Sequence, residues 1–188
     1  MSYKKLKITA IIVLISLVTL EIAAVLSNDL YFEKVAAKEV RKRKMPSHTA
    51  NAVKHAYAAS LVYSGFRTVY FSENIAKNAT IFFGKINEMA EVVFKPNQDS
   101  TLEMMKDLQN NLIGIHAAKW LEENEEQDRL DFIGSLAERK ILILFREEIA
   151  LPDEEKLKAK RSSSYREAEK WFEENRKEIE ENIKIAVD

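Results

Sequence analysis

The sequence predicts an all-α protein, with a single helical domain behind one N-terminal transmembrane or signal segment. Its 188 residues include only four Gly and three Pro beside many Ala, Glu, Lys and Leu, a composition that favours helices over tight turns. Serine-led capping motifs precede two stretches of helical periodicity. With 46% apolar residues, a chain of this length can bury one core, so one domain is expected.

Composition also excludes several kinds of function. The 29 basic and 30 acidic residues nearly cancel, so we expect no nucleic-acid partner. The absence of Cys excludes disulfides, thiol catalysis and Cys-based metal sites. There is no phosphate-binding Gly loop, G-x-S-x-G or H-E-x-x-H motif, so no cofactor is expected and no residue is assigned to a metal.

Residues 8–26 form an apolar segment in which only Glu21 is charged, and a short basic region precedes it. The aliphatic side chains should outweigh one carboxylate, so this segment is expected to enter a membrane. It is either an uncleaved anchor or a signal peptide cleaved near Val25–Ser27, and a buried core helix is a third interpretation. An uncleaved anchor places the protein in the inner membrane, facing the periplasm or the outside. A cleaved signal peptide makes it secreted or periplasmic.

The remaining chain divides by composition into three further parts. Residues 28–46 are expected to form an amphipathic basic linker helix, which Pro46 ends. It is either a solvated spacer or a contact to anionic lipid through the basic run Arg41, Lys42, Arg43 and Lys44. Residues 1–27 are the signal peptide or anchor that precedes this linker. A helical domain should follow the linker over 47–152, and a charged C-terminal helix over 153–188.

The predicted helices follow from their start and stop signals. Ser47 or Thr49 should cap a helix that ends near Ser64, and Ser100 with Glu103 forms a capping box. The further expected elements are an apolar-rich helical stretch over 66–94, a turn at 95–99, helices over 100–123 and 127–139, and a short strand or buried helix end at 141–145.

The last predicted helix begins with a second capping box, Ser164 and Glu167. Its apolar positions line one stripe, whereas the other face is Glu and Lys. Docking onto the domain is the preferred interpretation, and binding of a protein partner is the alternative. The stripe consists of Tyr165, Ala168, Phe172, Ile179, Ile183 and Ala186.

The helix over 100–123 has an unusual composition. At about 100° per residue, Met104, Met105, Leu108, Leu112 and Ile115 gather on one side as a core stripe. The opposite side holds Asp107, Asn110, Asn111 and Gly114. Asn and Gly are poor helix formers, so this face predicts a second helix packed closely over Gly114, with polar groups that bond the others.

His55 supplies a candidate partner for that face. Its neighbours one turn away are Ala or Asn51, so another helix or a ligand can reach the imidazole. We therefore predict a polar inter-helix site around His55. Its expected members are Asn51, Lys54, Asn110, Asn111 and Gly114.

Three short motifs resemble an uncharacterised bacterial all-helical domain family. The motifs are K-H-A-Y at 54–57, N-E at 87–88, and M-K-D-L-Q-N-N at 105–111 followed by Gly114. The family signature is R-H-A-Y, later H-E, then M-D-L-x-N-N-x-x-G. The resemblance covers about 51–145 and implies a helical fold in an exported or modular protein, without a settled activity.

This chain departs from that signature at charged positions. Lys54, Asn87, Gln109 and Ile115 stand where the family tends to have Arg, His, His and Arg, and Lys106 is inserted. His55, Glu88 and Asp107 remain as candidate catalytic residues, with His55 as a base or the three as metal ligands. We expect a structural or interaction module; the alternative is a hydrolase acting on a lipid, peptidoglycan or phosphoester, so enzyme activity stays open.

Overall fold

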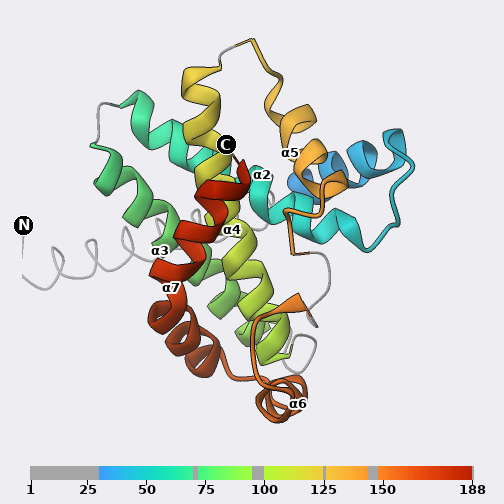
Figure 1. The fold of residues 1–188 in the computed structure, drawn as a ribbon, viewed down its shortest axis with the longest axis vertical. Helices are drawn as coiled ribbons and strands as arrows, with labels where there is room; N and C mark the ends of the chain where they lie inside the picture. The colour runs from blue at the N-terminus through green and yellow to red at the C-terminus, as the bar shows by residue number, and fades with distance from the viewer. Residues whose placement is uncertain (1–29, 70–71, 95–99, 125, 144–147, 188) are drawn as a thin grey trace, which may run out of the picture.

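The computed structural model describes residues 30–69, 72–94, 100–124, 126–143 and 148–187, and these residues contain helices but no strand. The prediction of an all-α fold is confirmed. Residues 30–42 are helical. The helices after them are α2 (Thr49–Thr68), α3 (Glu73–Phe94), α4 (Thr101–Glu123), α5 (Arg129–Glu138), α6 (Asp153–Arg161) and α7 (Tyr165–Val187) (Figure 1).

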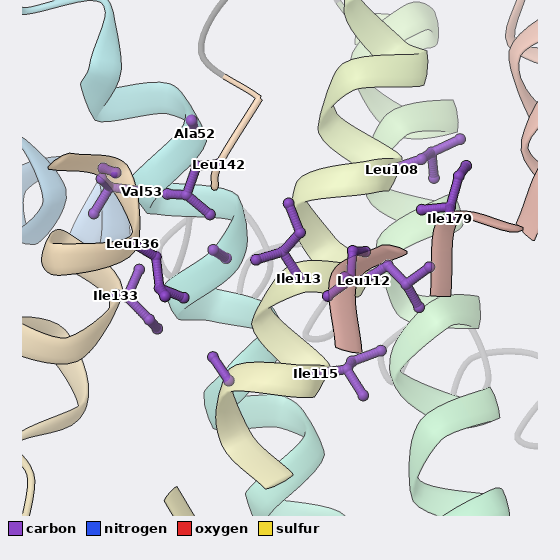
Figure 2. Packing of buried hydrophobic residues seen from close by; sticks show 14 of the residues in the cluster. Ala52, Val53, Leu108, Leu112, Ile113, Ile115, Ile133, Leu136, Leu142 and Ile179 are labelled. Atoms are coloured by element: carbon purple, nitrogen blue, oxygen red, sulfur yellow. The ribbon is translucent and has the colours of Figure 1, made fainter. Parts of the chain in front are cut away.

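Helix α4 is the centre of the fold, and α2, α3, α5, α6 and α7 all pack against it (Figure 1). The predicted core stripe is buried, but so is the side of α4 that faces away from it. In Figure 2, Ile113 points toward Leu142, whereas Leu112 and Ile115 lie on the side of Ile179. Side chains of α4 therefore join the core in more than one direction, which the prediction of a single stripe missed.

Two of the predicted helix starts are confirmed and one is wrong. The Ser100 Oγ accepts a hydrogen bond of 3.2 Å from the Glu103 amide, and the Ser164 Oγ accepts one of 3.3 Å from the Glu167 amide. At the start of α2, neither Ser47 nor Thr49 caps the helix. His48 takes that position but makes no side-chain capping bond to the helix, and a backbone turn closes this end through Thr49 N–H to Pro46 O at 3.0 Å.

The break between the second and third helices lies further along the chain than expected. Helix α2 runs through Gly65 to Thr68, and α3 begins at Glu73. A Cβ added at Gly65 would meet nothing within 4 Å, so this glycine is not required for a turn or a close contact. Its low helix propensity alone did not end the helix.

The segment expected to be a linker is part of the domain. Ala36 and Val40 are buried in the same core as α2 and α4. Arg43 forms ion pairs with Glu39, Asp131 and Glu138 at 2.6, 2.7 and 2.6 Å. The expectation of a solvated linker is therefore corrected, because the domain begins no later than the helical residues 30–42.

Other members of the basic run differ in environment. Lys42 contacts Asp131 at 3.2 Å and Glu39 at 3.6 Å. Arg41 and Lys44 are exposed. A lipid contact by the whole run would therefore compete with the ion pairs that Lys42 and Arg43 already make within the domain.

The aliphatic run near 141–145 is neither a strand nor a helix in its described part, residues 141–143. Leu142 is buried. The Asn110 side chain accepts a hydrogen bond of 3.0 Å from the Ile143 N–H and donates one of 2.9 Å to the Ile143 carbonyl. An asparagine thus satisfies backbone groups that a strand would pair with a neighbour. Residues 144 and 145 lie outside the described part.

The charged C-terminal region consists of two helices, α6 and α7, rather than one. Helix α7 docks against α4 and α3, and Ala168, Phe172, Ile179 and Ile183 are all buried. This is the docked arrangement preferred above. Trp171 and Val187 are also buried and extend the predicted stripe.

The predicted membrane segment at 8–26 and the predicted turn at 95–99 lie outside the described residues. Among the helices of the described part, none combines the length and the apolar character needed to cross a membrane.

Candidate functional site

Three helices bring together a histidine and two carboxylates, which we call the His55 cluster: His55 of α2, Glu88 of α3 and Asp107 of α4. The His55 Nδ1 lies 3.6 Å from Glu88 Oε1, and the Nε2 lies 3.6 Å from Asp107 Oδ2. The residues are 4%, 1% and 3% exposed. The two carboxylates therefore face opposite nitrogens of one imidazole in the interior of the protein.

Glycines stand at two helix contacts of this assembly, and the one at Gly114 is required for it. A Cβ at Gly114 of α4 would lie 2.1 Å from the backbone oxygen of Ala56 in α2, so only glycine fits. A Cβ at Gly84 of α3 would lie 2.8 Å from the Asn111 amide nitrogen. The close approach predicted over Gly114 is confirmed, and its partner is the helix that contains His55.

Asp107 is held by further polar groups. The Asn51 amide donates to its two carboxylate oxygens at 3.0 and 3.2 Å. The Lys106 ammonium lies 3.6 Å from Asp107 Oδ1 and also donates to Glu103. Burial alone would lower the pKa of Lys106, but Asp107 and Glu103 outweigh it and raise this pKa above 10.5. Lys106 is therefore a buried cation beside the cluster.

The other predicted members of the polar site do not all reach His55. The Lys54 ammonium lies 3.8 Å from Glu91 Oε1. Asn110 bonds the backbone of Ile143, as described above. Asn111 packs toward Gly84 of α3. The predicted set thus divides into separate contacts, because residues of α4 and α2 face several neighbouring elements at once.

Sequence reasoning missed two contributors to this region. Lys106 was treated as an insertion, although its position three residues after Glu103 is typical of a helical ion pair. Tyr165 of α7 was assigned to the apolar stripe. Burial raises the pKa of its hydroxyl, and the carboxylates of Glu169 and Glu88 raise it further, so the Tyr165 hydroxyl remains protonated at neutral pH.

The arrangement supports two kinds of chemistry. The two contacts of His55 are 3.6 Å long, which is longer than an ordinary hydrogen bond. A protonated His55 would carry one positive charge between the two carboxylates. Lys106 would balance the remaining negative charge of the pair. One ligand atom from each of the three residues also lies within 4.8 Å of the others. These three residues could hold a zinc or manganese ion through one ring nitrogen and two carboxylate oxygens.

The fold and the site define an all-α domain with a buried histidine–carboxylate cluster at the contact of three helices. Compared with models of protein families, with curated proteins and with solved structures, the chain matches none of them.

Proposed function

We propose that the protein is a membrane-anchored or exported structural or interaction module, in which the His55 cluster holds α2, α3 and α4 together. The observation behind this proposal is the enclosure of His55 by carboxylates from two other helices, with all three residues almost fully buried. An enzyme site must admit a substrate, whereas this cluster lies in the core. Asn51 and Lys106 further fix Asp107 in place.

The membrane part of this proposal rests on the apolar segment at 8–26. A segment of this length and composition favours insertion, and the domain would then sit on the periplasmic or outer side. Fractionation of cells that produce the full chain tests it. Retention in the membrane after a carbonate wash supports an anchor, whereas a soluble, shortened chain in the periplasm supports signal cleavage.

Stability measurements on the full chain in detergent test the structural role. Asp107→Asn should lower the free energy of unfolding by about 2–3 kcal/mol, because it removes a buried charge that Lys106 and His55 face. Asp131→Asn is the matched control. The Asp131 side chain is 43% exposed, so the same chemical change should cost less than about 1 kcal/mol.

A double-mutant cycle of His55→Gln with Asp107→Asn isolates their interaction. We expect a coupling free energy of about 1–3 kcal/mol. Additive effects of the two substitutions would show that His55 and Asp107 do not stabilise each other, and the structural proposal would then fail. Asn51→Ala, which removes two hydrogen bonds but no charge, gives a milder variant for the same cycle.

The second candidate function is hydrolysis of a lipid, peptidoglycan or phosphoester. It is favoured by the ligand atoms of His55, Glu88 and Asp107, which lie within 4.8 Å of one another and could hold a metal ion that activates water. Calorimetry with Mn²⁺ or Zn²⁺ and hydrolysis of bis(p-nitrophenyl) phosphate test it together. Metal binding and turnover that both vanish in Glu88→Gln support a hydrolase, and their absence from the unmodified chain contradicts it.

A further inference from the structure

Helix α3 has an apolar face that points away from the core, and we call it the outer face of α3. It consists of Ile75, Phe82, Met89 and Val93, with Phe83 at its edge toward α2, and the exposed fractions of these residues lie between 48% and 66%. The helix lies at one edge of the molecule (Figure 1). Large apolar side chains grouped in this way on a protein surface indicate an interaction site.

The same helix uses a different face for the core. Ala76, Thr80, Ile81 and Glu88 are buried, and at about 100° per residue they project from the side opposite to Ile75 and Phe82. Helix α3 therefore has two apolar faces: one packs inside the domain, and the other is exposed.

The outer face has the spacing of a helix-pairing seam. Apolar residues recur at alternating steps of four and three, at positions 75, 79, 82, 86, 89 and 93. This is a seven-residue repeat, the pattern by which one α-helix packs along another. A bilayer surface requires no such repeat, so the spacing favours a helical partner.

Charge at the border of the face also bears on the partner. Lys85, at this border, pairs with Glu169 and Glu173 at 3.0 and 2.7 Å. An interfacial helix at a lipid surface instead presents Lys and Arg to the headgroups. The other border positions include Asn74 and Asn78, so two identical faces can meet without repulsion between like charges.

The area of this face lies at the lower end of what a specific homodimer interface buries, about 1,000 Å² in total. A buried aromatic side chain covers about 150–250 Å², so five half-exposed large residues, with the half-buried ones between them, offer roughly 500 Å² on each copy. A standard interface takes about 800 Å² from each partner. Phe66 of α2, whose ring stacks on Phe83 at 5.9 Å, enlarges the apolar surface.

We propose that the outer face of α3 binds the same face of a second copy of this chain, so that the protein is a homodimer through paired α3 helices. Such a contact is isologous, because each copy contributes the same residues. This inference is independent of the role of the His55 cluster, which lies on the inner side of α3.

Single-cysteine variants test the dimer, because the chain has no cysteine of its own. Phe82 lies near the middle of α3, so Phe82→Cys should meet its counterpart in either a parallel or an antiparallel pair. Mild oxidation of the full chain in detergent should convert most of it to a disulfide-linked dimer. Lys170→Cys on α7, whose side chain is 74% exposed, is the matched control and should remain monomeric on denaturing gels.

A second variant tests the contact without a cross-link. Met89→Lys should shift the full chain from dimer to monomer in sedimentation velocity while its helical circular dichroism remains unchanged, since Met89 is 48% exposed. A monomeric parent chain would overturn the proposal. So would a Phe82→Cys variant whose thiol is protected from maleimide but forms no disulfide, because residues 8–26 or the bilayer would then cover the face.

Discussion

Helices α4 and α7 have the same length, 23 residues, but opposite relations to the core. Sixteen residues of α4 are buried, among them Lys106, Asp107, Asn110 and Asn111. Only six residues of α7 are buried, and they form one apolar stripe. A helix with a single covered face shows that face in its sequence, whereas a helix covered on several sides must mix apolar and polar residues around its whole circumference.

The largest expected effect concerns the contact between α4 and α2. Gly114→Ala would place a Cβ 2.1 Å from the Ala56 backbone oxygen, which cannot move without α2. We expect the free energy of unfolding to fall by about 4 kcal/mol, although Ala has a higher helix propensity than Gly. Thermal unfolding followed by circular dichroism measures it.

Gly65→Ala in α2 is the matched control, because a Cβ there meets nothing within 4 Å. It should stabilise the chain by about 0.5–1 kcal/mol. Equal melting temperatures for the two variants would show that α2 and α4 do not approach as closely as described.

Truncation of a buried side chain in the apolar stripe of α7 should cost less stability than Gly114→Ala. Phe172 is 1% exposed, so Phe172→Ala should lower the free energy of unfolding by about 3 kcal/mol through lost contacts and the cavity left behind. Ile185 lies on the same helix but is 81% exposed. Ile185→Ala should change stability by less than about 0.5 kcal/mol, and a comparable loss in both variants would contradict docking by one face.

The buried Asn110 of α4 and the half-buried Asn175 of α7 should differ as well. Asn110→Ala removes two hydrogen bonds to the Ile143 backbone and leaves those groups without side-chain partners, at a cost of about 2 kcal/mol. Asn175→Ala on α7 removes a bond of 2.8 Å to the Trp171 carbonyl of its own helix. Urea unfolding should show that Asn175→Ala lowers the free energy of unfolding by less than about 1 kcal/mol. A larger loss for Asn175→Ala than for Asn110→Ala would contradict the contacts described for these two residues.

The smallest effect is the pH dependence of the contact between α7 and α3. Burial alone would raise the pKa of Glu180, but hydrogen bonds from Lys77 and Arg176 outweigh it and lower this pKa below 4.5. The carboxylate therefore stabilises the fold above the unfolded-state pKa, and this contribution is lost as pH falls through the lower, folded-state pKa.

Glu180→Gln should reduce stability at neutral pH by about 1 kcal/mol or less and flatten its fall in acid. Glu181→Gln, at an exposed position next to it, is the control and should keep the parent profile. Melting temperatures recorded between about pH 7 and pH 3 provide the comparison, and parallel curves for Glu180→Gln and the parent would exclude a role for this ion pair.

The sequence by itself determined the helical fold, the serine caps at Ser100 and Ser164, and the stripe of α7. These features depend on local propensity, short-range hydrogen bonds and periodicity, all of which are contained within one segment. The sequence also indicated that Gly114 meets another helix, because its residue type is otherwise unfavourable there.

Only the tertiary structure decided which residues meet. It placed Glu88 and Asp107 on opposite nitrogens of His55, directed Asn110 to Ile143, and joined Arg43 to α5. These partners are separated by tens of residues, and their pairing depends on how helices cross and on which faces remain for each neighbour. Periodicity assigns a residue to a face of its helix, whereas packing in three dimensions selects what that face contacts.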